Sequence, residues 1–189
     1  LPFFHVEAGL RTGDLANPFP EELNRVVASR IAALHFAPTA GAREQLLREG
    51  VDDAIIAVTG NTVIDALLWT RARGFSHGLP LRAGRRLIVV TAHRRESFGA
   101  PMRNMLRALK GIVATHPDVH VVYPAHPNPE VRRAIADELG DSTAIAVVEP
   151  LSYGPFVALL DASTLILTDS GGVQEEAPAL GKPVLVLRD

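Results

Sequence analysis

Residues 168–189 read TDSGGVQEEAPALGKPVLVLRD. The apolar run Leu165–Leu167 leads into this stretch, a glycine pair follows Ser170, and a helical pattern then continues to a Gly-Lys-Pro turn at 181–183. Another apolar run begins directly after that turn. A strand, a tight turn, a helix and a second strand in this order predict a parallel βαβ unit.

The same alternation extends backward from this stretch to Arg85. Its short apolar runs are continuous, which is typical of strands covered on both faces. We predict strands over 86–91, 119–123, 144–148, 165–168 and 183–187, with helices over 101–115, 130–139, 153–161 and 172–180. This part of the chain should therefore form a doubly wound α/β sheet, in which ligands bind at the carboxyl ends of the strands.

The first sixty residues repeat the pattern less completely. We predict strands over 3–6, 35–37 and 55–58, helices over 21–34 and 41–49, and a further helix that ends at Trp69. The pattern favours three parts, which are the carboxyl-terminal half of a first Rossmann-like domain (1–60), an interdomain helix and linker (61–84), and a second Rossmann-like domain (85–189). Both ends of the chain fall within predicted strands, so we expect a fragment of a longer protein.

Composition argues against several classes of function. The 189 residues carry 19 basic and 21 acidic side chains, a formal net charge of -2 that gives no sign of a nucleic-acid-binding surface. Cysteine is absent, which excludes disulfides and thiolate metal sites and fits a reducing cytoplasm. No apolar run approaches the roughly 20 residues that cross a bilayer. We therefore expect neither a metal site nor a membrane partner.

Ser170, Gly171 and Gly172 form the first candidate site. A strand that runs through them into a helix exposes free backbone N–H groups and the positive end of the helix dipole, without a Cβ to keep a phosphate away. The alternative is a plain turn with Ser170 as N-cap. Glu176 follows early in the helix, where it favours the dipole or accepts hydrogen bonds from a ribose. Pro178 predicts a short helix.

Two glutamates are the candidate catalytic carboxylates. Glu7 follows the first strand in a glycine-containing loop, where it either pairs with Arg11 or acts at a site. Glu21 opens a helix and is spaced i, i+4 from Arg25, which is typical of an exposed ion pair. The alternative places Glu21 beside Glu7, with Arg25 holding its charge and orientation. Two carboxylates at one site suit a reaction that removes a proton and returns it.

Positive and aromatic side chains mark further candidates. His93 and Arg94 lie in TAHRRESFG, directly after a strand, and suit a diphosphate through charge-assisted hydrogen bonds. Alternatively, Glu96 would form a structural salt bridge with one of the arginines, which would then not be available to bind phosphate. His126 lies in a proline-rich turn that indicates structure before function. Phe156, near a helix start, is typical of a core residue, although an aromatic side chain at a cleft mouth can stack on a base.

Seven motifs, taken in order, resemble those of the non-hydrolysing UDP-N-acetylglucosamine 2-epimerases. They are HVEAGLRTGD, PFPEELNR, TGNTVIDALL, TAHRRESFG, HPNP, EPLSYGPFV and the stretch 168–189. The resemblance covers nearly the whole chain and is weakest between Thr70 and Arg85. It implies the GT-B arrangement of two Rossmann-like domains facing across a cleft, a homodimer, and cytoplasmic interconversion of UDP-GlcNAc and UDP-ManNAc for surface polysaccharides.

The resemblance also implies roles for particular residues. Glu7 and Glu21 match the catalytic carboxylates, Arg25 the arginine beside them, and His93 a histidine that contacts the substrate phosphates. The matched substrate-binding positions are Ser170, Gly171 and Gly172 for the diphosphate, Glu176 for the ribose, and Phe156 with the backbone of Leu151 for the uracil.

In some bacterial members of the family a second UDP-GlcNAc binds as an allosteric activator, and Arg94 and His126 resemble residues of that second site. The family reaction expels UDP from C1 while a base removes the C2 proton, which gives 2-acetamidoglucal, and UDP then re-adds. It requires no cofactor or metal. Part of the family's site would precede Leu1, so we expect the isolated segment to be inactive.

Three other functions remain open at this point. A hydrolysing epimerase shares the fold and the catalytic logic but releases UDP and free ManNAc. A GT-B glycosyltransferase would need an acceptor site and gives no special reason for paired glutamates. A non-catalytic nucleotide-sugar sensor would use the same anion cradle.

Overall fold

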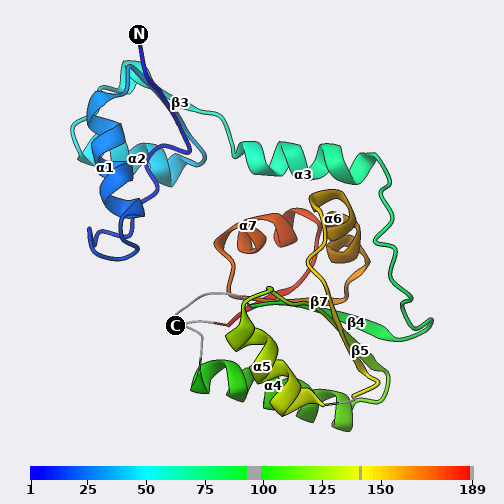
Figure 1. Cartoon of the computed structure of the whole chain (residues 1–189). Helices are drawn as coiled ribbons and strands as arrows, with labels where there is room; N and C mark the ends of the chain where they lie inside the picture. Colours follow the sequence, from blue (N-terminus) through cyan, green and yellow to red (C-terminus); the bar gives the residue numbers. More distant parts are fainter. Residues whose placement is uncertain (93–98, 141, 188–189) are drawn as a thin grey trace. The chain divides into compact units, whose positions relative to one another are not determined.

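The computed structural model describes residues 1–92, 99–140 and 142–187, and the chain divides into two compact units, Leu1–Asp65 and Ala66–Asp189 (Figure 1). Each unit contains its own parallel β-sheet. Helix α3 (Thr62–Ala72) spans the boundary, and most of its residues belong to the second unit. The α/β class with parallel sheets, predicted from the alternating pattern, is confirmed.

The first unit has a three-stranded sheet in the order β1-β2-β3. Its elements, in chain order, are β1 (Phe4–Val6), α1 (Glu21–Ile31), β2 (Leu34–Ala37), α2 (Ala40–Arg48), the 3-10 turn Asp53–Ile55 and β3 (Ile56–Val58). Thr39 caps α2, because its side chain accepts a hydrogen bond of 3.1 Å from the amide of Ala42. Crossover connections through α1 and α2 allow the strands to run parallel.

One face of this sheet is covered and the other is open among the described residues. The small core consists of Ala8, Ala37, Ala42 and Leu46, all at most 5% exposed. Side chains alternate along a strand, and the register places Phe4 and Val6 on the face opposite to Ala37. Phe4 is 54% exposed and Val6 is 51% exposed. The first unit is therefore built on one side of its sheet only.

The second unit has a five-stranded sheet in the order β6-β5-β4-β7-β8. After α3, its elements are β4 (Arg86–Thr91), α4 (Ala100–Thr115), β5 (Val119–Pro124), α5 (Pro129–Leu139), β6 (Ile145–Val148), α6 (Tyr153–Ala162), β7 (Leu165–Thr168), α7 (Gly171–Ala179) and β8 (Val184–Val186). The chain builds outward from β4 to one edge and then returns to β4 to build the other half. This order is that of a Rossmann-type doubly wound sheet.

Helices cover both faces of the second sheet. Figure 1 shows α4 and α5 on one side of it and α6 and α7 on the other. Val90 of β4 packs with Leu106 of α4 in one core, whereas Val89 packs with Leu67 of α3 and Leu160 of α6 in the other. Consecutive side chains therefore enter opposite cores, which explains why the strands are apolar without alternation.

The strand order reverses between β4 and β7. These strands are neighbours, and their register pairs Thr91 with Thr168, so the last residues of both strands lie side by side. In doubly wound sheets, a crevice opens at the carboxyl ends of the two strands where the order reverses, and ligands bind there. The turn after Thr168 is therefore at the expected ligand position of this unit.

The predicted helix over 21–34 is wrong at its end. Helix α1 ends at Ile31, because Ala32 has an extended backbone and the amide of Ala33 donates a hydrogen bond to the carbonyl of Phe3. Leu34 then begins β2. Helix α3 continues to Ala72, beyond the predicted end. The other predicted elements agree with the observed ones to within one residue at each end.

None of the helices that the structure describes has the length and apolar character needed to cross a bilayer. Within the same residues, no group of three or more histidine, cysteine, aspartate or glutamate side chains is placed to hold a metal ion.

Candidate functional site

Glu7 has a strained backbone directly after β1. Its φ of 57° lies in the left-handed region, which costs a residue with a Cβ roughly 1–2 kcal/mol. It is the only residue other than glycine with a positive φ in the described part of the chain. Its side chain is exposed. A backbone outlier of this kind points to a functional position.

The residues after Glu7 hold this conformation in place. The amide of Ala8 donates a hydrogen bond of 3.0 Å to the carbonyl of Phe36 in β2, and the Ala8 side chain is fully buried. At Gly9, a Cβ would lie 2.1 Å from the carbonyl oxygen of Ala42 in α2, so only glycine fits. The loop that begins at Glu7 is therefore fixed to both elements.

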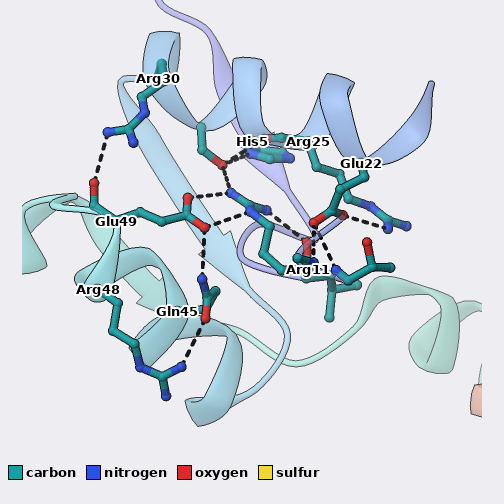
Figure 2. Close-up of polar contacts among 12 residues, drawn as sticks. His5, Arg11, Glu22, Arg25, Arg30, Gln45, Arg48 and Glu49 are labelled. Atoms are coloured by element: carbon teal, nitrogen blue, oxygen red, sulfur yellow. Dashed lines mark hydrogen bonds and ion pairs between the residues drawn. The ribbon is translucent and has the colours of Figure 1, made fainter. Parts of the chain in front are cut away.

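Arg11 is held by a network that does not include Glu7. Its guanidinium donates two hydrogen bonds of 2.9 Å to the carboxylate of Glu49, one of 2.7 Å to Ser29 Oγ and one of 2.8 Å to the carbonyl of Leu10 (Figure 2). The Arg11 side chain is 7% exposed. The pairing of Arg11 with Glu7, one of the two sequence interpretations, is therefore not observed.

Glu49 is the acceptor at the centre of this network. Burial alone would raise the pKa of Glu49, but hydrogen bonds from Arg11 and Gln45 and the charges of Arg11 and Arg30 more than offset it, so the pKa is lowered. Arg30 also donates a hydrogen bond of 2.9 Å to the Glu49 carbonyl (Figure 2). The ionised carboxylate ties the Arg11 loop, α1 and α2 together.

Two histidines of adjacent strands lie next to this network. His5 of β1 and His35 of β2 pair in register, with ring centroids 6.1 Å apart. His5 Nδ1 is 3.4 Å from Ser29 Oγ, whereas both ring nitrogens of His35 are buried without a hydrogen-bond partner among the described residues. Burial is the largest cause that lowers the pKa of both rings, and nearby positive charges lower it further. Both rings therefore resist protonation.

Glu21 and Arg25 lie in the first turns of α1, as predicted, but they do not form the predicted i, i+4 pair. Glu21 is exposed, and Arg25 Nη1 instead lies 3.9 Å from Oε2 of Glu22. Glu22 is the buried member of the two glutamates, at 1% exposed. Figure 2 shows its carboxylate between the Arg25 guanidinium and the loop. The i, i+3 pair with a buried carboxylate leaves Glu21 to face outward.

In the second unit, the turn between β7 and α7 is tied to the ends of both central strands. Thr91 Oγ1 and Thr168 Oγ1 are 2.6 Å apart in a buried hydrogen bond. The amide of Ser170 donates to Thr168 Oγ1 at 2.9 Å, and the amide of Asp169 donates to the carbonyl of Thr91 at 3.1 Å. The start of α7 is therefore held at the point where the strand order reverses.

Among the described residues, neither a side-chain cap nor a packed neighbour covers the first residues of α7 at Ser170 and Gly172. Ser170 occupies the N-cap position, but its side chain makes no capping hydrogen bond, so the simple capping interpretation is not observed. A Cβ on Gly172 would meet nothing within 4 Å among the described residues, and its φ is not left-handed. Neither backbone conformation nor packing requires this glycine. Among the described residues, nothing at this position would keep an anion away from the first amides of the helix.

The residues predicted to bind the ribose and the uracil belong to α7, to α6 and to the segment before α6. Glu176 is 5% exposed, and its Oε1 accepts a hydrogen bond of 2.8 Å from the Tyr153 hydroxyl at the start of α6. Burial, followed by the hydrogen bond and charge of Glu176, raises the pKa of Tyr153 to about 12. Phe156 and Leu151 are partly buried and pack against the core that includes Val157. Tyr153 thus joins the start of α6 to the middle of α7.

The remaining candidates concern positive side chains. His93 and Arg94 lie outside the described residues. His126 is exposed in the turn before α5, where its Nδ1 accepts a hydrogen bond of 3.2 Å from the amide of Asn128. The predicted turn is therefore present, and a binding role for His126 stays a prediction.

Two residues with roles at these turns are not evident from the sequence. Glu22 carries a weak signal, because adjacent glutamates in the first turn of a helix point about 100° apart and one of them faces inward. Tyr153 carries no such signal, because no neighbouring residue in the sequence predicts its contact with Glu176, 23 residues away. Only the packing of α6 beside α7 does so.

Comparison with known proteins gives consistent matches over the full chain. The sequence model of the UDP-N-acetylglucosamine 2-epimerase family matches residues 1–189. The UDP-N-acetylglucosamine 2-epimerase of Bacillus subtilis is 55% identical over 98% of the chain and 49% of its own length. S. aureus MnaA, solved with UDP, superposes with a TM-score of 0.92 at 44% identity, over all of this chain and 52% of that structure.

A UDP-GlcNAc 2-epimerase from Neisseria meningitidis, solved bound to UDP-GlcNAc, gives a TM-score of 0.89 at 42% identity, over 100% of this chain and 53% of that structure. The chain spans about half the length of the relatives it matches. These relatives have the GT-B-like fold, so the predicted fold class is confirmed.

Proposed function

Because this chain belongs to the UDP-N-acetylglucosamine 2-epimerase family, we propose that the protein containing it interconverts UDP-GlcNAc and UDP-ManNAc. The family match over all 189 residues carries the proposal. The two sites described above support it, because one suits a nucleotide diphosphate and the other presents exposed carboxylates on rigid backbone. The roles of individual residues and the steps of the reaction belong to the same proposal.

The second unit would bind the UDP moiety at the start of α7. Ser170, Gly171 and Gly172 would cradle the diphosphate with backbone amides, and the open space above Gly172 supports this role. Glu176 would accept hydrogen bonds from the ribose, which would share this carboxylate with the Tyr153 hydroxyl. Phe156 and the backbone of Leu151 would enclose the uracil, and His93 would contact the phosphates.

Proton chemistry at C2 explains why a diphosphate site is part of the reaction. The C2 proton is not beside a carbonyl, so direct removal would be prohibitively slow. If a base takes this proton while the bond from C1 to the UDP oxygen breaks with its electron pair, the product is 2-acetamidoglucal and UDP. UDP then re-adds at C1 while a proton returns to the other face of C2. Stabilising the departing diphosphate is therefore catalysis as well as binding.

Glu7 and Glu21 would exchange these protons, and Arg25 would set the charge beside them. The left-handed backbone of Glu7 supports this assignment, because the fixed loop keeps a costly conformation at an exposed carboxylate. Replacing Glu7 or Glu21 by glutamine in the intact protein should abolish turnover and leave UDP binding largely unchanged. Activity that survives either replacement would remove that glutamate from the mechanism.

Several further statements come from the family resemblance alone. We propose the non-hydrolysing reaction, a cytoplasmic homodimer, and a role in supplying ManNAc units for surface polysaccharides. A second UDP-GlcNAc at Arg94 and His126 would act as an activator. The division into domains at 1–60, 61–84 and 85–189 also stays a prediction.

The deciding experiment incubates the intact protein with UDP-GlcNAc in D2O and follows C2 by NMR. We expect deuterium at C2 and a mixture of UDP-GlcNAc and UDP-ManNAc with the nucleotide still attached. Free ManNAc with released UDP would establish the hydrolysing alternative. No exchange at C2 would contradict the epimerase proposal, and transfer of the sugar to an acceptor would favour the glycosyltransferase.

A further inference from the structure

Glu22 is an almost fully buried carboxylate whose two oxygens have different surroundings. Its Oε1 accepts hydrogen bonds from the amides of Thr12 at 2.9 Å and Gly13 at 3.0 Å. Its Oε2 has no hydrogen-bond partner among the described residues. The Arg25 guanidinium is 3.9 Å from Oε2, and the Arg25 side chain is 37% exposed. One oxygen thus holds the loop, and the other faces a cation.

Holding the loop does not by itself require a charge. A glutamine would offer the same carbonyl oxygen to the two amides, whereas a buried carboxylate carries a desolvation cost that only a partner offsets. The separation of Oε2 and Nη1 is too long for a hydrogen bond but short enough for strong attraction between opposite charges. The negative charge of Glu22 therefore acts on Arg25.

The position of Glu22 connects the parts of the proposed proton-transfer site. Thr12 and Gly13 belong to the loop that begins at Glu7, and Glu21 is the residue directly before Glu22 in α1. The other end of the same loop is fixed at Gly9, against α2. One side chain therefore fixes the free end of the Glu7 loop to the helical turn that carries Glu21.

We infer that Glu22 is a positioning residue of this site. Its Oε1 fixes the Glu7 loop against α1, and its Oε2 holds the Arg25 guanidinium and offsets the positive charge beside Glu7 and Glu21. This role rests on the proposed function, and Glu22 itself does not touch the reacting atoms. His5, Arg11 and Glu49 are further charged or titratable residues in the same part of the first unit as Glu22 (Figure 2).

Two replacements of Glu22 in the intact protein separate its roles. Glu22→Gln keeps an acceptor for the loop amides but places a neutral donor beside Arg25. Glu22→Ala removes both the acceptor and the charge. Glu44→Gln is the matched control, because Glu44 is exposed on α2 of the same unit and pairs with Arg48 at 3.5 Å. The measurements are kcat, the pH–rate profile, UDP affinity, and amide hydrogen exchange at Thr12 and Gly13.

Glu22→Gln should lower kcat roughly 10- to 100-fold, the scale for a displaced catalytic group, with UDP affinity and loop exchange unchanged. The acidic limb of its pH–rate profile should move to lower pH, because the uncompensated Arg25 charge favours the ionised form of the nearby carboxylates. Glu22→Ala should show the same loss together with faster exchange at Thr12 and Gly13. Glu44→Gln should match the wild type throughout.

A Glu22→Gln protein with wild-type kcat and an unmoved acidic limb would overturn the inference and reduce Glu22 to a structural loop anchor. If the wild type itself does not turn over UDP-GlcNAc, the proposed function fails instead. Amide hydrogen exchange at Thr12 and Gly13 needs no substrate, so it still tests whether Glu22 holds the loop against α1. Unchanged exchange in Glu22→Ala would contradict that attachment.

Discussion

At the scale of single residues, Glu7 is where the first unit departs most from ordinary backbone geometry. The strand ends, Ala8 must be buried, and Gly9 must approach α2 closely, so the chain turns at Glu7 with a φ of 57°. The exposed side chain does not contribute the packing that would compensate for this conformation. An uncompensated conformation of this kind is typical of functional positions, which agrees with the role proposed for the Glu7 carboxylate.

Glycine at this position should therefore stabilise the chain at the expense of the carboxylate. We expect Glu7→Gly to have a free energy of unfolding about 1 kcal/mol higher than Glu7→Ala, because glycine adopts a left-handed φ without steric cost. Within helix α2, at Glu44, the order should reverse, with glycine less stable than alanine by about 1 kcal/mol. Urea unfolding measures all four variants. The same order at both positions would mean that Glu7 is not left-handed in solution.

His5 and His35 predict a pH dependence of stability. The pKa of both rings is lowered from 6.5 in the folded state, so the unfolded state binds protons first as the pH falls. Stability should be complete above pH 6.5 and should decline below it. The lowered pKa of Glu49 adds a separate loss at more acidic pH, below its ordinary value of 4.5.

Replacing His35 tests this dependence. His35→Leu should raise the free energy of unfolding at neutral pH by about 1 kcal/mol, because it removes buried polar atoms without partners among the described residues. It should also flatten the decline below pH 6.5. Urea unfolding as a function of pH provides the measurement, with the exposed His116 replaced by glutamine as control. A decline of wild-type size in His35→Leu would assign the effect to other groups.

At the level of elements, the turn before α7 is hydrogen-bonded to the central strands, whereas the first turn of α7 has few described neighbours. Its turn is hydrogen-bonded to Thr91 and Thr168, yet no described residue lies where it would exclude a side chain at Gly172. Helix α4 offers a matched case, because Gly111 is also helical and also has open space around a would-be Cβ. Gly172 lies in the first turn of α7, at the proposed diphosphate cradle, whereas Gly111 lies within α4, away from that cradle.

Alanine at these two positions should separate folding from binding. Gly172→Ala and Gly111→Ala should each leave stability unchanged or raise it by up to about 1 kcal/mol. Gly172→Ala should weaken UDP binding roughly tenfold, equivalent to about 1.4 kcal/mol, because its Cβ fills the space over the helix amides. Gly111→Ala should bind UDP as the wild type does. Calorimetric titration of the intact protein decides, and unchanged UDP affinity in Gly172→Ala would place the diphosphate elsewhere.

At the scale of the whole molecule, the two units have unequal cores. Among the described residues, the buried core of the first unit has 4 members, whereas the two cores of the second have 16 and 11. The first sheet is also covered on one face only, with Phe4 and Val6 more than half exposed. Buried apolar area sets most of the stability, so the first unit should open more readily.

Hydrogen exchange followed by mass spectrometry should show this difference in the 189-residue chain. We expect amides of β1, β2 and β3 to exchange faster than those of β4, β5 and β7, which lie inside a sheet covered on both faces. Equal protection in the two sheets would mean that the units unfold together. In the intact protein, the difference should shrink if additional chain covers the open face of the first sheet.

The elements and the class of fold can be predicted from the amino-acid sequence alone. Continuous apolar runs such as Arg86–Thr91 can be buried only between two layers of helices, and the alternation of strand and helix permits only parallel pairing. The prediction of a helix over 21–34 was wrong at its carboxyl end. The residues after Ile31 are apolar enough for a helix or a strand, and pairing with β1 favours the strand. Motif resemblance likewise identified the family from the chain alone.

Which residues contact one another depends on how the chain packs in three dimensions. Strand order makes Thr91 and Thr168 neighbours although 77 residues separate them. Packing places the Tyr153 hydroxyl within hydrogen-bonding distance of Glu176 and pairs Arg11 with Glu49. It also buries the side chain of Glu22, whereas Glu21 stays exposed. Local propensity depends on neighbours in sequence, whereas a buried charge is matched by whatever group the folded chain brings within a few ångströms. For that reason the partners of Arg11 and Arg25 followed from the fold and not from their spacing in the sequence.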